Sequence, residues 1–235
     1  MRRIHIRSLS LVALALLAFA GRAPAQDKSP ALLNTLEVRQ LVAHGEPGDQ
    51  ARLTAHFSAL AERYTAEAKL HTSMAQNSVG NPSRSLATGS LRAHCTRLGE
   101  LNAQSATALR ELAAYHQKLA SGVAATPPTA GARFEGGAGA PAPTDQELNA
   151  LAAKASTPAD HRALEEYFAT LAKRYTSEAV DHNAMANAYR GLPRNPGWAA
   201  AAAAHCDRLV TRSRASAREA TGAAAIHKQL AGVAR

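Results

Sequence analysis

The sequence contains few aromatic residues, with one Trp, five Tyr and four Phe among 235 residues. Proteins that bind single-stranded nucleic acid stack bases on aromatic rings and hold the backbone with clustered Lys and Arg. In this chain Lys and Arg are interspersed with Glu and Asp instead of forming blocks. We therefore expect no nucleic-acid partner. The scarcity of rings to line a porphyrin slot also leaves non-covalent haem binding between paired histidines as a lesser alternative.

The common sequence signatures of catalysis are missing. The chain has no Gly-rich phosphate-binding loop, no His-Glu-x-x-His motif and no recognisable nucleophile with its base and orienting residue. It has no Cys-x-x-Cys-His motif for covalent haem attachment. A carboxylate-bridged di-iron bundle requires Glu-x-x-His pairs, whereas the spacing here is Glu-x-x-x-His. We therefore expect a protein that is not an enzyme.

Long apolar runs are missing after the first 25 residues. The single run, from Leu9 to Ala20, follows a basic start and precedes Ala23-Pro24-Ala25, a pattern typical of a secretory signal peptide. The run is too short to span a bilayer as a mature helix. Cleavage near Ala25 removes four Arg and no acid, which lowers the formal net charge from +9 to +5. We predict a signal peptide over 1–25, no transmembrane segment, and a mature protein in the periplasm or secreted.

An internal repeat dominates the rest of the chain. A shift of 111 residues aligns residues 57–120 with residues 168–231 without a gap. The identical positions at the start of the repeat recur at i, i+3, i+4 and i+7, which is the spacing of one face of a helix. The retained face is therefore predicted to be the buried one. In the first copy it consists of Phe57, Leu60, Ala61, Tyr64, Glu67, Ala68, His71, Met74 and Ala75.

Helix-breaking residues divide each repeat into two long helices. Gly and Pro at 80–82 and at 191–193 act as stop signals in the middle of each copy. Each copy is therefore a predicted helical hairpin, and two hairpins packed together bury a core that one alone cannot. The sequence predicts an all-α fold in which two duplicated long helical hairpins pack as a four-helix bundle.

The boundaries of the repeats follow from composition. We predict hairpin repeat 1 over 26–121, a Pro/Gly/Ala-rich linker over 122–144 and hairpin repeat 2 over 145–235. A short helix is expected before each hairpin, around 32–43 and 146–154. Such a linker would also permit exchange of hairpins between chains, so the oligomeric state stays open.

A set of metal-ligating residue types recurs in both copies. With the hairpin turn centred near 81–82, His94 is expected at a height between Glu67 and His71, which are four residues apart on one helix face. Imidazole and carboxylate suit zinc, iron or copper, and thioether or thiolate ligands shift the preference toward copper(I). We therefore predict a transition metal ion as cofactor. The predicted ligands are Glu67, His71, His94, Glu178, His182 and His205, with Met74 and Met185 as candidate outer ligands.

A structural role for the same residues is the main alternative. A Glu and a His four residues apart can pair with each other or with Arg63 and Arg97, and such buried polar groups can set helix register without binding anything. The protein would then be a non-catalytic structural or protein-interaction bundle with an unknown protein partner. His116 and His227 are expected to be structural, because a cation in the last turn of a helix suits the helix dipole.

The two cysteines form a candidate disulfide. Cys95 and Cys206 occupy equivalent positions of the two copies, and a pair of cysteines in an exported chain suggests one disulfide between them. That disulfide would tie the two second helices together. It would also remove both thiolates from metal ligation, so a soft-metal site requires Cys95 and Cys206 to stay reduced.

Overall fold

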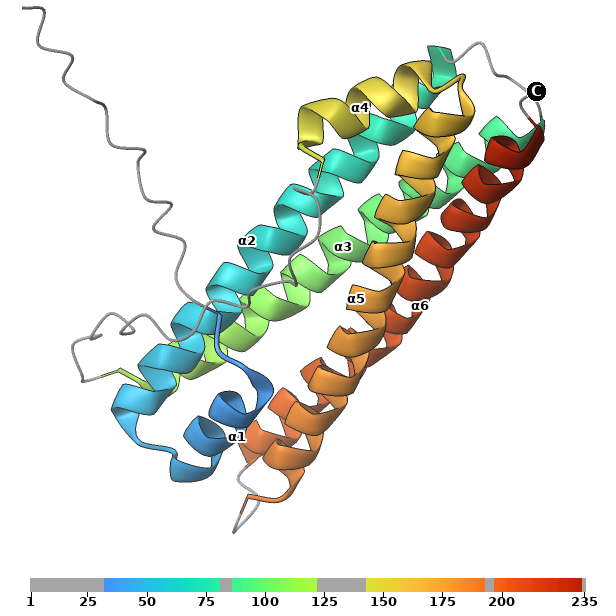
Figure 1. Ribbon diagram of the computed structural model, residues 1–235. Coiled ribbons are helices and arrows are strands. Elements are labelled where there is room, and N and C mark those ends of the chain that lie inside the picture. The colour runs from blue at the N-terminus through green and yellow to red at the C-terminus, as the bar shows by residue number, and fades with distance from the viewer. Residues whose placement is uncertain (1–31, 81–85, 122–142, 193–196, 234–235) are drawn as a thin grey trace, which may run out of the picture.

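The computed structural model describes residues 32–80, 86–121, 143–192 and 197–233 (Figure 1). The predicted signal peptide, 1–25, and all but the last two residues of the predicted linker lie outside these residues. The described residues form helices and no strand, which confirms the all-α expectation. The elements are α1 (Thr35–His44), α2 (Pro47–Asn77), the short 3-10 helix η1 (Ser78–Gly80), α3 (Leu86–Leu119), α4 (Asp145–Lys154), α5 (Pro158–Arg190) and α6 (Gly197–Val233).

Capping residues set where the helices begin. The side chain of Asn34 accepts from the backbone N–H of Glu37, whose carboxylate accepts from the backbone N–H of Asn34. This reciprocal arrangement satisfies two N–H groups that have no partner within the helix. Thr144 with Glu147 and Thr157 with Asp160 form the same arrangement at the starts of α4 and α5. At the end of α1, Gly45 takes a left-handed conformation with φ of 72°, which reverses the chain toward α2.

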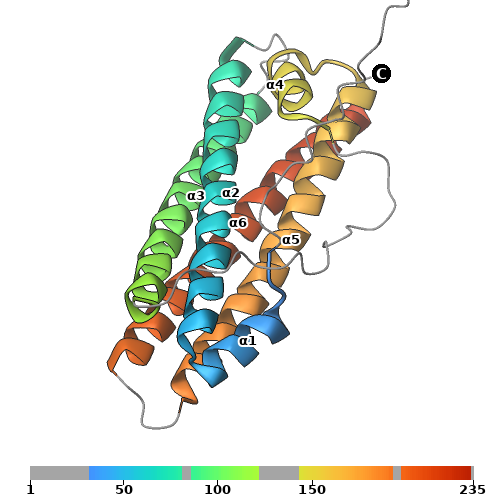
Figure 2. The same ribbon diagram turned by 90° about the vertical axis from the view of Figure 1, so that its left-hand side faces the viewer.

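The helices pack as a bundle in which two long helices stay apart. α2 packs against α3, α5 against α6, and α3 against α6. Over the described residues, α2 and α5 make no close backbone contact. The space between α2 and α5 is covered at one end by α1, which contacts both helices (Figures 1 and 2). At the opposite end it is covered by α4, which lies mainly against α2.

The face retained in both repeats lies in the core, as its periodicity predicts. Phe57 and Phe168 are completely buried, and so are the rings of Tyr64 and Tyr175. Met74 is completely buried and belongs to the same stripe of α2. Within the described residues, no helix combines the length and apolar character needed to cross a bilayer.

Candidate functional site

A closed ring of four charges joins α2 to α5 at the middle of the bundle. The Arg174 Nη2 donates to Glu67 Oε2 at 2.6 Å, and the Arg63 Nη2 donates to Glu178 Oε1. Within each helix, Arg63 Nε lies 3.7 Å from Glu67 Oε1 and Arg174 Nε lies 3.4 Å from Glu178 Oε1. Each carboxylate therefore sits between two guanidinium groups, one from each repeat. The ring carries no net charge and bridges the two helices across the space between them.

Two buried tyrosines complete this ring. The Tyr64 hydroxyl donates to Glu178 Oε2, and the Tyr175 hydroxyl donates to Glu67 Oε2 at 3.2 Å. Burial raises the pKa of Glu178, while Arg63 and Arg174 act to lower it. Since each carboxylate has three partners in the ring, Glu67 and Glu178 lie among arginine and tyrosine side chains rather than beside the histidines of their predicted trios.

His71 is the most unusual side chain of the core. It is completely buried, and in the described part of the chain neither of its ring nitrogens has a hydrogen-bond partner. Its ring centroid lies 6.3 Å from those of Tyr167 and Phe168. Burial, and then the charge of Arg174, lower the pKa of His71 to about 4, so the imidazole is neutral at pH 7. A buried donor or acceptor without a hydrogen bond lowers stability by about 1–3 kcal/mol, so a ligand that binds this imidazole would remove that cost.

Two sulfur atoms lie close to the height of His71. Met74 follows His71 by three residues on the same buried stripe. Gly99 of α3 lies against α2, since a Cβ there would come within 2.9 Å of Thr72 Oγ1. Cys95 precedes Gly99 by one turn, and α3 runs antiparallel to α2, so Cys95 lies near the height of Met74. An imidazole, a thioether and a thiol therefore lie at similar heights along the bundle.

The contact of Gly99 also corrects the register expected for His94. It places residue 99 level with Ala68 to Thr72, so His94 lies about one turn beyond His71 along α2. The His94 Nδ1 lies 2.6 Å from Glu219 Oε2 of α6. His94 therefore has its partner on α6 rather than on α2.

The equivalent histidine of the second repeat behaves similarly. His205 Nδ1 lies 3.3 Å from Glu111 Oε2 of α3 and 2.7 Å from Arg208 Nη2. Burial lowers the pKa of His205, and Arg208 adds to that effect. The structure thus gives the Glu and the two His of each predicted trio different surroundings.

His182, the counterpart of His71, combines burial with access to a cavity. Its Nδ1 has no hydrogen-bond partner among the described residues, and only 3% of the residue is exposed. Burial, followed by the charges of His56 and Arg63, lowers its pKa to about 3. Met185 follows on the same stripe of α5, as Met74 follows His71. Cys206 of α6 is completely buried.

A cavity of about 420 Å³ lies beside His182, between α1, α2 and α5. Its apolar wall includes Leu33, Val38, Leu60 and Met185. The cavity lies in the space that α2 and α5 leave between them. It was not anticipated from the sequence, although one signal was available, because the repeat aligns His56 of this cavity with the larger Tyr167.

Both cysteines are free and buried over the described residues, so the predicted disulfide between Cys95 and Cys206 is not formed. The contacts of His94 with Glu219 and of His205 with Glu111 show that α3 and α6 run antiparallel. Cys95 consequently lies near residue 219 of α6, about 20 Å along the axis from Cys206. Burial raises the pKa of each thiol to about 12.

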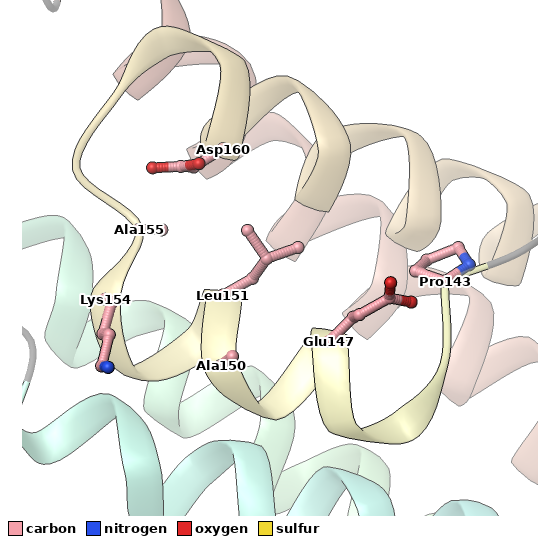
Figure 3. Close-up of a pocket in the computed structure, with 7 residues that line it drawn as sticks. All are labelled: Pro143, Glu147, Ala150, Leu151, Lys154, Ala155 and Asp160. Atoms are coloured by element: carbon pink, nitrogen blue, oxygen red, sulfur yellow. The ribbon is translucent and has the colours of Figure 1, made fainter.

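A second hollow lies between α4 and the start of α5 (Figure 3). Its two carboxylates, Glu147 and Asp160, are those of the helix caps described above and accept backbone N–H groups. Leu151 contributes an apolar side chain between them. Both carboxylates are therefore already engaged in capping the helices.

Within the residues that the structure describes, no three side chains of His, Cys, Asp or Glu come together in a group that could hold a metal ion. A metal site here would therefore depend on thioether as well as imidazole and thiol donors. Comparison of this chain with protein-family models, with curated proteins and with solved structures gives no match.

Proposed function

We propose that the protein is an exported, non-catalytic four-helix bundle of two duplicated helical hairpins that binds copper(I). His71 and Met74, with the Cys95 thiol near their height, would hold one ion. His182 and Met185, with Cys206, would hold a second ion at the equivalent place of the other repeat. The observation that carries this proposal is the complete burial of His71 with both ring nitrogens unpartnered among the described residues.

The donor types favour copper(I) over zinc or iron. Zinc also binds thiolate and imidazole, but the thioether of a methionine is a soft ligand that shifts the preference toward copper(I). The two candidate carboxylates, Glu67 and Glu178, are bonded to arginine and tyrosine. A neutral imidazole with a pKa of about 4 and a thioether need not lose a proton to bind metal, whereas a thiol with a pKa of about 12 must release one.

A purely structural or protein-interaction bundle is the second candidate, and the charged ring favours it. Arg63, Glu67, Arg174 and Glu178 join the two repeats without any ligand and would fix the register between α2 and α5. On this alternative, the free energy of unfolding would be indifferent to metals and chelators. Under the copper proposal it would rise with copper(I), because a ligand that binds the native state stabilises it.

The metal content of the purified protein distinguishes the copper-binding proposal from the structural alternative. The full chain would be expressed without a His-tag, purified from the periplasm, loaded anaerobically with copper(I) and analysed by mass spectrometry. We expect about two copper ions per chain, one for each repeat. The double variant His71→Ala/His182→Ala should lose them. The matched variant His94→Ala/His205→Ala, which removes histidines bonded to carboxylates, should retain them.

An isosteric substitution removes the sulfur donors without opening a cavity. Met74→Leu/Met185→Leu should bind copper(I) at least about tenfold more weakly, with little loss of stability, because Met and Leu have similar volumes. A wild-type protein that takes up no copper(I) would rule the proposal out. Equal copper in the wild type and in the His71/His182 double variant would do the same.

A further inference from the structure

The two ends of the space between α2 and α5 are filled differently. At the α4 end, the Tyr167 ring packs against Phe168 at 5.1 Å and against His71 at 6.3 Å. At the α1 end, the repeat places His56 where Tyr167 stands. His56 is smaller, and the structure leaves the cavity of about 420 Å³ beside it. The α1 end therefore has room that the bulkier tyrosine takes up in the other repeat.

The cavity has the size and walls of a small-molecule site. Ligand pockets span about 300–1,000 Å³ and are mainly apolar, with a few polar groups that fix orientation. Leu33 comes from the segment before α1, Val38 from α1 itself, Leu60 from α2 and Met185 from α5. The Leu33 N–H donates to His56 Nδ1 at 3.1 Å, which fastens this segment across α2. The cavity is thus built from three elements held in place by packing and by a hydrogen bond.

Three buried nitrogens that line the cavity make no hydrogen bond within the described residues. His182 Nδ1, Arg63 Nε and Arg174 Nε are buried and lack hydrogen-bond partners over the described residues, and all three side chains line the cavity. The carboxylates that line it are engaged, because Glu178 accepts from Arg63 and Asp181 accepts from the Thr35 hydroxyl at 2.6 Å. The arginine Nε–H groups can only donate and His182 Nδ1 donates in one of its tautomers, so a hydrogen-bond acceptor would satisfy all three nitrogens.

The charge of the surroundings selects against an anion. Both guanidinium groups belong to the neutral four-charge ring, and Asp181 adds a negative charge beside them. A ligand that supplies an acceptor oxygen without a formal charge meets the unpartnered nitrogens and adds no buried charge.

We infer that this cavity binds an uncharged small molecule with an apolar body and a carbonyl or ether oxygen, of about 10–20 non-hydrogen atoms. The apolar body lies against Val38, Leu60 and Met185. The oxygen accepts from the nitrogens of His182 and of the guanidinium groups. This site shares His182 and Met185 with the proposed second copper site, so it is tested on the metal-free chain.

A neutral fluorophore tests the inference directly. Prodan, an uncharged naphthalene that carries a ketone, would be titrated into the metal-free full chain, with emission measured against free dye. We expect saturable, blue-shifted emission with one site per chain. The anionic dye 1-anilinonaphthalene-8-sulfonate should bind at least about tenfold more weakly, which is a difference of about 1.4 kcal/mol.

Two cavity-filling variants and one control locate the bound dye. His56→Tyr copies the α4-end residue into the α1 end and should weaken prodan binding at least about tenfold. Leu60→Phe narrows the cavity without touching the hydrogen bond to Leu33 and should do the same. Tyr167→Phe, at the opposite end, should leave the affinity within about twofold, with circular dichroism confirming that each variant is folded.

The inference is overturned if the wild type shows no saturable binding. It is also overturned if both filling variants bind prodan as the wild type does, or if the anionic dye binds as tightly as the neutral one. Because the titration is carried out without metal, these outcomes are independent of whether copper(I) binds.

Discussion

His116 and His227 occupy equivalent positions at the two ends of the bundle, but they differ in how many of their ring nitrogens are hydrogen-bonded. At the α1 end, His116 Nδ1 lies 2.6 Å from Gln50 Oε1, and His116 Nε2 lies 2.7 Å from the Tyr189 hydroxyl. At the α4 end, His227 Nδ1 lies 3.2 Å from His161 Nδ1. The His227 Nε2 has no partner among the described residues. One imidazole is thus fully bonded and its counterpart is half bonded.

The length of one side chain accounts for this difference. The repeat aligns Tyr189 with Ser78, and the serine hydroxyl donates to the Ala75 carbonyl at 2.9 Å instead of reaching a histidine. At the α1 end, both ring nitrogens of His116 are bonded, and an open cavity lies beside His56 and His182. At the α4 end, Tyr167 fills the space, and His71 and His227 have ring nitrogens without hydrogen-bond partners among the described residues. A few substitutions between the repeats therefore determine where the helices leave room for a ligand and whether His116 or His227 has both ring nitrogens bonded.

Acidification should produce the largest effect, since both ends bury neutral histidines. Burial lowers the pKa of His56, His71, His116 and His227 to about 4 and that of His182 to about 3. The unfolded chain binds more protons than the native one between about pH 6.5 and 4, so stability falls as the pH drops through this window. At pH 5 each group contributes a loss of about 2 kcal/mol, and together they approach the whole stability of a domain.

Circular dichroism at 222 nm measures this transition. The protein should be folded and show little change above pH 7, and should unfold cooperatively between pH 6.5 and 4. Burial raises the pKa of Glu178, which acts in the opposite direction, so a Glu178→Gln variant should keep the acid transition. Stability that stays constant from pH 7 to pH 4.5 would contradict the burial of neutral histidines at the two ends.

Breaking the ring between the ends should have the next largest effect. Glu178→Ala leaves Arg63 and the Tyr64 hydroxyl without their acceptor and should lower the free energy of unfolding by about 2–4 kcal/mol. Glu67→Ala should cost a similar amount if the two repeats are equivalent here. Urea unfolding measures both, with Glu100→Ala as the control, because the pair of Glu100 with Arg97 is exposed.

The two central histidines should respond unequally to the same change. His116→Leu leaves Gln50 and Tyr189 buried without partners and should cost about 2 kcal/mol. His227→Leu removes an imidazole that is already half bonded and should cost about 1 kcal/mol or less. Equal losses in urea unfolding would show that the missing hydroxyl at position 78 has no energetic consequence.

The smallest effects are expected on the faces of α3 and α6. His94→Ala and His205→Ala remove contacts with partly exposed carboxylates and should each change the free energy of unfolding by less than about 1 kcal/mol. A loss above about 2 kcal/mol for either variant would mean that these pairs contribute to the core.

Local patterns of the sequence predicted the helices but not the register in which neighbouring helices pack along the bundle axis. The Gly and Pro stop signals and the spacing of the buried stripe indicated where the long helices end and which face they bury. The height of His94 relative to His71 depends on the close approach of Gly99 to α2. That approach is a tertiary contact, which helical periodicity does not contain.

The partners of the stripe residues also come from long-range packing. Glu67 meets Arg174, more than a hundred residues away, because α2 and α5 run antiparallel at one particular register. The cavity depends on α2 and α5 staying apart beneath α1. The mismatches between repeats, His56 with Tyr167 and Ser78 with Tyr189, were visible in the sequence, and their meaning required knowing which space each side chain fills.

X-ray absorption at the copper edge of the copper(I)-loaded full chain tests the central claim most directly. If His71 with Met74 and His182 with Met185 hold the metal, the spectrum will show sulfur and imidazole nitrogen in the first coordination shell. The sulfur contribution will fall in Met74→Leu/Met185→Leu. A shell of nitrogen and oxygen alone, unchanged in that variant, would contradict the claim and return His71 and His182 to a structural role.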